Sequence, residues 1–424
     1  MHNRLTKFYS RFLPILFILN GYGVSGFPIG LGSILLVCFV ILSFLDRSKK
    51  IRSLDNLKPI GLFIFLFFIS LLDFLFENSI EYTSVFSAFL KMLIWACSVS
   101  VLASAYLDIS LFKEHYRIFC NVCTIYLFAQ NIIWRLFRVF IPNLYTIGPI
   151  HPLYEQYSQG TLQQYIISTN LTRFGSFFSE PAFYGHMMLA NIILILFCRD
   201  NERLVRRDII ELAFISLGIL LSTSTGAIVL LMLIYILFGL MKKGVKYFVI
   251  LGSSAIALFY LFSHSPFKDN NIVQFFLYKM THMSTSGRIG VSFSNILKLT
   301  NRQLIMGIGI GNTSMIADGY LNSFASIIIS FGLIGFVAFL LFSGSYFVKG
   351  GPLIKVLMTI YVLGSFQGAI AFSIHGVLYL SLVMAMLEQH DKLYERNSNT
   401  ESSHKSKLDK VLIDQRRDII TINE

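Results

Sequence analysis

Hydrophobic and polar positions in this chain are grouped in long blocks. Runs at residues 26–45, 60–76, 84–107 and 332–348 hold very few charges. Each is about as long as a helix needs to cross roughly 30 Å of hydrocarbon. Because lipid offers the backbone no hydrogen-bond partners, such runs must satisfy their own polar groups as helices. The pattern predicts an all-α polytopic membrane protein.

The same blocks predict about twelve transmembrane helices and two large periplasmic loops. We expect the helices at about residues 12–24, 26–45, 59–76, 84–107, 118–140, 182–198, 209–222, 226–241, 247–263, 323–347, 353–371 and 375–388. They would form one integral membrane domain, residues 1–388, followed by a cytoplasmic and partly disordered tail, residues 389–424.

Charges between the blocks alternate in sign. Basic clusters follow the second, sixth and eighth expected helices, whereas Glu77 and Glu81 follow the third. Cytoplasmic loops carry an excess of Lys and Arg, so both termini are predicted to be cytoplasmic. The residues of the basic clusters are Arg47, Lys49, Lys50, Arg52, Lys58, Arg199, Arg203, Arg206, Arg207, Lys242, Lys243 and Lys246.

Composition agrees with this class of protein. Of 424 residues, 55% are hydrophobic and 14% are charged, and the net charge is +12. Because the basic residues are spread over several loops, they indicate topology and give no single face for nucleic acid. Cys120 and Cys123 form a C-x-x-C with no second pair, which favours two small apolar helix residues over a redox or zinc site.

Two long segments, residues 141–181 and 264–320, are expected outside the membrane and define the candidate site. Arg173 is the only Lys or Arg in the first segment. Its guanidinium fork suits pyrophosphate oxygens, although a surface salt bridge is an equal alternative. Glu180 precedes Pro181 where a helix should begin, so it is either a helix cap or a general base for a sugar hydroxyl.

The second segment carries Arg288 in Ser-Gly-Arg and then the run Gly307-Ile-Gly309-Ile-Gly311-Asn312. This G-x-G-x-G spacing does not fit a dinucleotide-binding fingerprint. We predict a tight backbone turn that lets the loop return toward the membrane.

Five further polar residues occur inside or at the ends of expected helices. Arg135 and Arg138 close the fifth helix, where snorkelling toward the interface is the simplest explanation. Lys91 lies inside the fourth helix, where charge is costly, and is a candidate for holding an anionic lipid head group. His186 and His375 are rival bases to Glu180, each weighed against a packed structural role.

Several weak motifs in a fixed order resemble the Wzy-type O-antigen polymerases of the O-antigen ligase and polymerase superfamily. They are Arg173-Phe-Gly-Ser-Phe-Phe-Ser-Glu180-Pro181, Leu221-Ser-Thr-Ser-Thr-Gly226, Ser286-Gly287-Arg288, Gly307-Ile-Gly309-Ile-Gly311-Asn312, and Asn322 leading into Phe331-Gly332-Leu-Ile-Gly335. The motifs cover roughly residues 170–340.

The resemblance implies a glycosyltransferase of the bacterial inner membrane that joins undecaprenyl-pyrophosphate-linked repeat units at the periplasmic face. Arg173 and Arg288 would hold the pyrophosphate and Glu180 would orient or deprotonate the acceptor. Asn312 and Asn322 would line the sugar site, with Tyr320, Arg135, Arg138, Lys91 and His186 as further substrate-binding candidates. A chain-length regulator and a flippase are the implied protein partners.

The external segments contain no paired-carboxylate motif such as D-x-D. We therefore expect no metal and no cofactor, and an inverting transfer by single displacement. Two alternatives stay open: an O-antigen ligase and a lipid-linked oligosaccharide flippase. The ligase is disfavoured because Asp318-Gly-Tyr320-Leu-Asn322 lacks the histidine of ligase-like relatives, and the flippase because the chain shows no internal repeat.

Overall fold

The computed structural model describes residues 2–24, 29–46, 54–75, 82–146, 150–152, 174–198, 204–243, 288–316 and 321–389. In this part the chain is helical apart from short turns and one pair of three-residue strands. The longer helices are α1 His2–Leu19, α2 Leu31–Leu45, α3 Lys58–Phe74, α4 Tyr82–Cys97, α6 Ile109–Phe137, α8 Pro181–Phe197, α9 Arg206–Leu221, α10 Thr225–Phe238, α13 Arg288–Leu297, α15 Ser323–Lys349, α16 Pro352–Gln367 and Ile374–Gln389.

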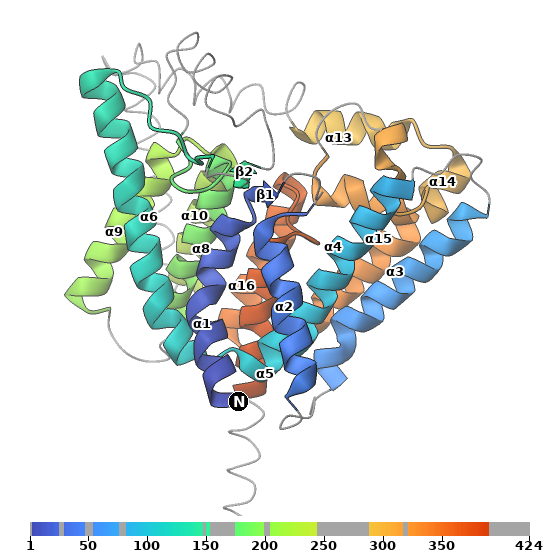
Figure 1. Ribbon diagram of the computed structural model, residues 1–424, viewed down its shortest axis with the longest axis horizontal. Helices are drawn as coiled ribbons and strands as arrows, with labels where there is room; N and C mark the ends of the chain where they lie inside the picture. The colour runs from blue at the N-terminus through green and yellow to red at the C-terminus, as the bar shows by residue number, and fades with distance from the viewer. Residues whose placement is uncertain are drawn as a thin grey trace, which may run out of the picture.

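Shorter elements complete the bundle. Helix α4 continues through a π-helical segment, Ser98–Ala103, into α5, Ser104–Tyr106, and α14 spans Asn301–Met306. Strands β1, Tyr22–Val24, and β2, Ile150–Pro152, pair antiparallel with Gly23 opposite His151. The strands and α13 lie at one end of the bundle, and the start of α1 with the N-terminus lies at the other (Figure 1). We call these the β1–β2 end and the amino-terminal end.

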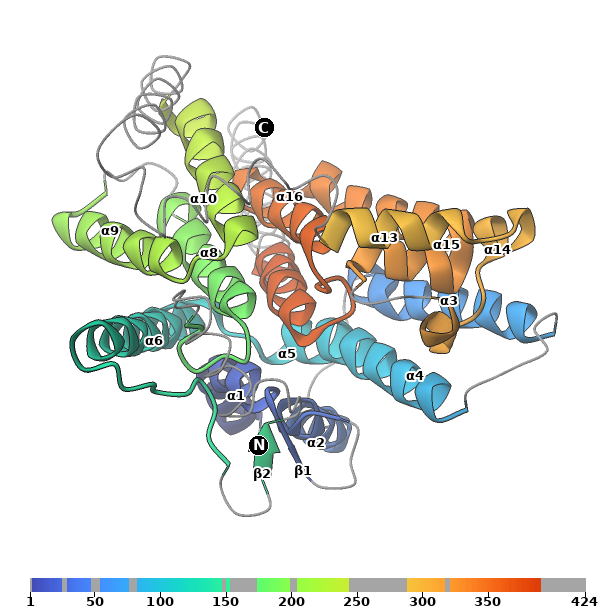
Figure 2. The same cartoon turned by 90° about the horizontal axis from the view of Figure 1, so that it is seen from above.

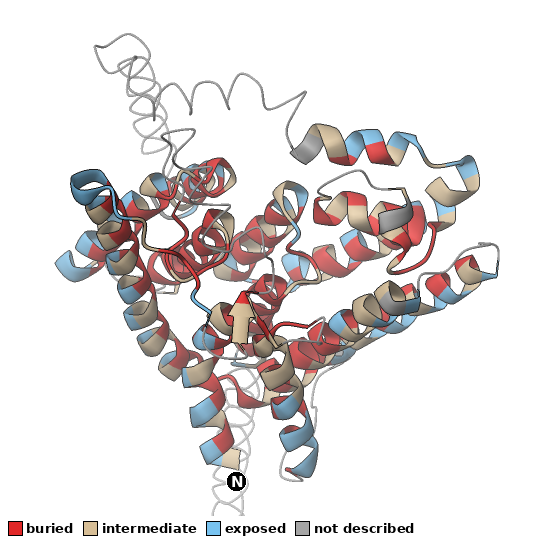
Figure 3. Ribbon diagram, turned by 45° about the horizontal axis from the view of Figure 1, so that its top comes forward, coloured by how far each residue is buried: buried red, intermediate tan, exposed pale blue. Residues whose placement is uncertain are grey.

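The centre of the bundle is formed by α8 and the helix Ile374–Gln389, both almost completely buried (Figures 2 and 3). They are joined by the Tyr379 hydroxyl, which donates to the His186 carbonyl at 2.9 Å. The surrounding helices turn large apolar side chains outward, among them Phe44, Phe68 and Leu341. Such a surface is unsuited to water but matches lipid.

Within the described residues, three helices are long and apolar enough to cross a membrane: Asp55–Phe74, Ser84–Tyr106 and Ser323–Lys349. The same part of the chain holds five shorter apolar helices. The prediction of an all-α membrane protein is confirmed at this level. The number of spans stays a prediction, and the expected ninth helix, residues 247–263, lies outside the described residues, as does the tail from residue 390.

Several predicted helix boundaries are wrong, and two of the differences have a clear structural cause. The segment 12–24 ends as a helix at Leu19, because Tyr22–Val24 pairs with β2 instead. The segment 118–140 begins earlier, at Ile109, because the Asp108 carboxylate caps the helix by accepting hydrogen bonds from the amides of Ser110 and Leu111 at 3.0 and 3.2 Å. A capped start lets the helix extend through polar residues that an apolar pattern omits.

Replacing the Asp108 cap with alanine should cost about 1 kcal/mol of stability at neutral pH. Hydrogen bonds from Ser110 and the Leu111 amide hold the pKa of the Asp108 carboxyl below its usual value, despite its partial burial. A lowered folded-state pKa gives stability that is present above about pH 4 and is lost as the pH falls through the folded pKa. Thermal unfolding in detergent should therefore show Asp108→Ala to be less stable than the wild type at pH 7, and this difference in stability should shrink in acid. A difference in stability that grows in acid would contradict the prediction.

Helix α15 contains a break at Gly332, whose φ and ψ are 65° and −172°. This conformation is nearly confined to glycine. The break lies against a glycine turn in which the amides of Ile308 and Gly309 donate to the carbonyls of Ile329 and Ser330 at 2.9 and 3.0 Å. These hydrogen bonds give partners to backbone carbonyls beside the break, for which lipid would offer no donor.

Positive φ values occur at Gly307, Gly309 and Gly311. The predicted tight backbone turn is therefore confirmed. The turn is fixed at its other side by Ser70, whose hydroxyl accepts from the Ile310 amide.

The substitution Gly332→Ala should destabilise the protein by about 3 kcal/mol or more. A Cβ atom there would lie 2.0 Å from the Ile305 carbonyl oxygen. The alanine backbone would also have to adopt a positive φ. Gly344 in the same helix is a matched control, because a Cβ there meets nothing within 4 Å and alanine favours a helix. Denaturation in detergent should separate the two variants; equal stabilities would contradict the strained break.

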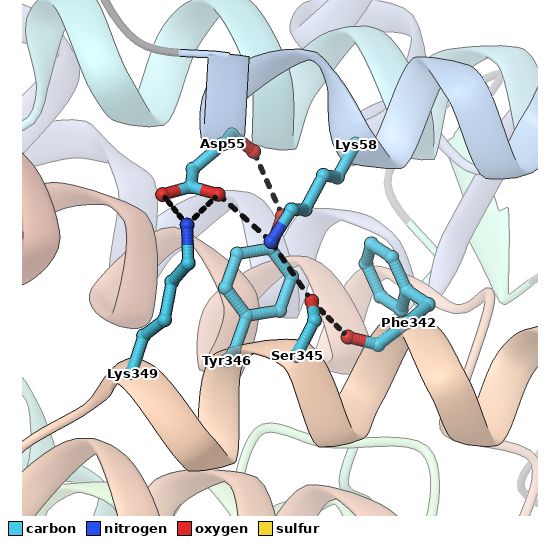
Figure 4. A network of polar contacts seen from close by, with 6 residues as sticks. All are labelled: Asp55, Lys58, Phe342, Ser345, Tyr346 and Lys349. Carbon is cyan, nitrogen blue, oxygen red and sulfur yellow. Dashed lines mark hydrogen bonds and ion pairs between the residues drawn. The ribbon is translucent and has the colours of Figure 1, made fainter.

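A polar network joins α3 to α15 at the amino-terminal end (Figure 4). The Asp55 carboxylate receives Lys349 Nζ at 2.9 Å and Lys58 Nζ at 2.7 Å. Lys58 also donates to the Ser345 hydroxyl, and the Tyr346 hydroxyl donates to the Asp55 carbonyl at 2.9 Å. The network fixes the start of α3 beside the last turn of α15.

A second ionic cluster joins α6 to α9. The Arg117 guanidinium donates to the Asp208 carboxylate at 2.7 Å and to Glu211 through both Nε and Nη2. The two carboxylates are nearly buried, at 5% and 6% exposed, whereas the Arg117 side chain is 19% exposed. Because its carboxylates are sheltered from solvent, removing the Arg117 cation should cost more stability than removing Lys349 from the surface pair with Asp55.

Candidate functional site

A cavity of about 430 Å³ lies at the β1–β2 end. Its wall comes from six parts of the chain: the end of α1, the start of α2, α4, the turn before α8, the start of α15, and the turn into Ile374–Gln389. The lining residues are Phe17, Asn20, Gly21, Gly30, Ser33, Leu36, Lys91, Ile94, Trp95, Phe178, Ser179, Phe183, Leu321, Ser323, Ser326, Ala369, Phe372, Ser373, Ile374, His375 and Val377.

The turn before α8 is held rigidly. The Gly175 amide donates to Asn143 Oδ1 at 3.2 Å, and the Ser176 hydroxyl donates to the Cys123 carbonyl at 2.6 Å. Ser176 adopts a φ of 58°, a left-handed conformation that these hydrogen bonds to distant parts of the chain help to maintain. This anchoring to α6 places Phe178 and Ser179 in the cavity wall.

The start of α15 is tied to the opposite wall. The Ser323 hydroxyl donates to the Gly368 carbonyl at 3.0 Å and accepts from the amides of Ile370 and Ala371 at 2.7 and 2.9 Å. The side chain of Asn322 caps α15 by accepting from the Ala325 amide at 2.8 Å. The end of the first predicted external segment, residues 174–180, and residues 321–323, which directly follow the second, therefore meet at one cavity.

Besides Asn20 and several serines, the polar groups of the cavity wall are Lys91, Trp95 and His375. Lys91 and Trp95 lie one turn apart on α4, so both fall on the same helix face. His375 lies at the start of Ile374–Gln389, where its ring stacks on Phe183 with 4.3 Å between centroids. Trp95 Nε1 and both ring nitrogens of His375 are buried and find no hydrogen-bond partner among the described residues.

The side chains of three predicted site residues lie outside the described part of the chain. Arg173 and Tyr320 lie outside the described residues, although Arg173 adjoins the buried Phe174. Arg288 is the first residue of α13, and its side chain lies outside the described part.

Glu180 stands next to the cavity-lining Ser179 and is the N-cap residue of α8, with Pro181 in the first turn. The helix start is as predicted, but the side chain makes no capping hydrogen bond. Glu180 therefore occupies the N-cap position at the positive end of the helix, as the capping interpretation predicted, without a hydrogen bond to the first turn.

The two predicted asparagines have structural hydrogen bonds. Asn312 is fully buried and its amide donates to the Ile308 carbonyl at 2.9 Å, which closes the glycine turn. Asn322 caps α15 beside the cavity residues Leu321 and Ser323. Neither asparagine is itself in the cavity wall.

The other predicted substrate-binding residues separate into two groups. Lys91 lines the cavity, whereas Arg135 and Arg138 lie on the exposed end of α6, with the Arg138 guanidinium 5.9 Å from the centre of the Trp134 ring. His186 is buried in α8 behind the cavity, close to Gly364. The structure thus unites Lys91 with the turn that follows Arg173.

Sequence reasoning weighed His375 only as a rival base and missed Trp95. The i, i+4 spacing of Lys91 and Trp95 was a usable signal. Among the described residues, no three His, Cys, Asp or Glu side chains are grouped as a metal site. Cys120 and Cys123 are buried free thiols.

No protein-family model, no curated protein and no solved structure matches the chain.

Proposed function

We propose that the protein is an O-antigen or polysaccharide polymerase that joins undecaprenyl-pyrophosphate-linked repeat units at the periplasmic face of the bacterial inner membrane. One observation carries the proposal. The end of the first segment chosen from sequence as the site and the residues that directly follow the second line a single cavity, in a bundle whose outer surface is apolar.

The charge distribution supports this orientation. The amino-terminal end carries Arg4, Lys7, Arg206 and Arg207 at the starts of α1 and α9, and Lys349 at the end of α15. Positive charge favours the cytoplasmic side. The cavity at the opposite end would then open toward the periplasm, where lipid-linked repeat units are polymerised.

The chemistry needs few parts. An acceptor hydroxyl oxygen attacks the anomeric carbon of the donor while the bond from that carbon to the pyrophosphate oxygen breaks. The hydroxyl proton passes to a base, for which Glu180 is the candidate, and the lipid pyrophosphate leaves with the bonding electrons. Cations aimed at that leaving group stabilise the transition state, and Lys91, Arg173 and Arg288 are the candidate cations.

Deleting the gene in its native host and separating the surface lipopolysaccharide on a gel tests the proposal. A polymerase predicts core that bears one repeat unit and no ladder. Bare core with lipid-linked polymer would indicate a ligase instead, and bare core with repeat units trapped in the cytoplasmic leaflet would indicate a flippase. An unchanged ladder would exclude all three functions.

Polymerisation by the purified protein should persist in excess chelator, because the proposed transfer depends on side-chain cations. The assay uses lipid-linked repeat units prepared from the deletion strain and follows polymer length. Loss of polymer that only added magnesium restores would contradict the metal-independent mechanism.

A further inference from the structure

His375 is the most unusual group in the cavity wall. The side chain is 4% exposed, it lines the cavity, and neither ring nitrogen has a hydrogen-bond partner among the described residues. A neutral imidazole has one donor and one acceptor, and buried polar groups are seldom left without partners. A hydroxyl-bearing ligand, which both donates and accepts, would satisfy them.

Trp95 faces the same cavity and strengthens this reading. Its indole Nε1–H is a donor only, is buried, and has no partner in the described part of the chain. The ring is held edge-on to Phe372, 5.1 Å between centroids. One turn away along α4, the Lys91 side chain is exposed and lines the same cavity.

We propose that this cavity is a saccharide subsite in which His375 and Trp95 bind sugar hydroxyls and Lys91 binds the adjoining phosphate. This inference rests on the proposed function, whose substrate combines these two chemical groups. Phe183, stacked on His375, offers the apolar surface on which sugar rings pack. Since the His375 nitrogens are shielded in this conformation, binding should include a local shift of the cavity wall.

Trp95 also provides the measurement. The chain has only two tryptophans, so Trp134→Phe leaves Trp95 as the sole indole emitter. We would titrate this variant in detergent with the lipid-linked repeat unit from the deletion strain. Forming a hydrogen bond to Nε1–H should shift the emission to longer wavelength. Undecaprenyl phosphate without sugar should leave the emission unchanged, and free repeat-unit oligosaccharide should reproduce the shift at higher concentration.

Variants then test the two assigned contacts. His375→Phe keeps the ring stacking but removes both nitrogens, and should weaken binding of the repeat unit at least about tenfold. His375→Asn retains a donor and an acceptor and should recover part of the affinity. Lys91→Met should weaken binding of the lipid-linked repeat unit but leave binding of the free oligosaccharide unchanged. His115→Phe, on α6 near the amino-terminal end, is the control and should bind as the wild type does.

The outcomes separate this inference from the proposed function. Polymerisation by the wild type with no response of Trp95, or with unchanged affinity and KM in His375→Phe, would overturn the subsite and leave the polymerase standing. A Trp95 shift that depends on His375, in a protein that makes no polymer, would support the subsite and overturn the polymerase. A shift caused by undecaprenyl phosphate alone would show a phosphate site and overturn the saccharide assignment.

Discussion

Replacing Arg173 or Arg288 by alanine should reduce polymer formation by about 100-fold or more, the loss expected when one preorganised donor to a developing anion is removed. In the proposed reaction these two cations hold the pyrophosphate as its bond to the sugar breaks. Arg173 immediately precedes Phe174, whose side chain is fully buried, and the rigid turn that follows lines the cavity. The readout is the lipopolysaccharide ladder in the deletion strain complemented by each variant, with protein in the membrane measured by immunoblot.

Lys298→Ala is the matched control, because Lys298 is an exposed cation in the same predicted external segment as Arg288. This variant should restore a normal ladder. Arg173→Lys and Arg288→Lys keep the charge but lose the planar fork, so they should restore only part of it. A normal ladder from either alanine variant, at wild-type protein level, would remove that arginine from the site.

The membrane class and the position of most helices follow from apolarity alone. Blocks such as residues 84–107 become helices because lipid leaves no other way to satisfy the backbone. The glycine turn at 307–311 was also predictable, since three closely spaced glycines indicate positive φ values. In each case the information lies within a short stretch of chain.

The break at Gly332 and the early start of α6 depend on partners that the local pattern does not contain. Gly332 lies in an apolar run that predicts an uninterrupted helix. The break is stabilised by hydrogen bonds from the amides of Ile308 and Gly309, which lie elsewhere in the chain. Helix α6 extends back to Ile109 because Asp108 caps it, although its first turns are polar.

The candidate site shows the same limit. Lys91 could be singled out from sequence because charge inside an apolar helix is costly. Trp95 looks like any interfacial aromatic residue until α4 meets the turn before Ile374–Gln389, where His375 lies. No periodicity relates two helices so far apart in the chain, so their convergence could not be read from one sequence.

The substitution Arg117→Met should destabilise the protein by about 3–5 kcal/mol, because it leaves buried carboxylates without their cation. Asp208 and Glu211 are 5% and 6% exposed and both receive the Arg117 guanidinium. Lys349→Met is the contrasting variant. Lys349 is 55% exposed and Asp55 keeps Lys58 at 2.7 Å, so its loss should cost less than about 1 kcal/mol. Denaturation of both variants in detergent gives the comparison.

A triple variant, Arg117→Met with Asp208→Asn and Glu211→Gln, tests why Arg117→Met is destabilising. The cause is either the unpaired buried carboxylates or the lost packing of the Arg117 side chain. If the cost of Arg117→Met comes mainly from burying uncompensated carboxylates, neutralising both should recover most of the stability. If the triple variant is no more stable than Arg117→Met, the cost comes instead from the packing of the Arg117 side chain between α6 and α9. The distinction matters for the site, because α6 also supplies the Cys123 carbonyl that anchors the turn before α8. A displaced α6 should therefore reduce polymerisation as well as stability, whereas Lys349→Met should leave polymerisation unchanged and lower stability by less than about 1 kcal/mol.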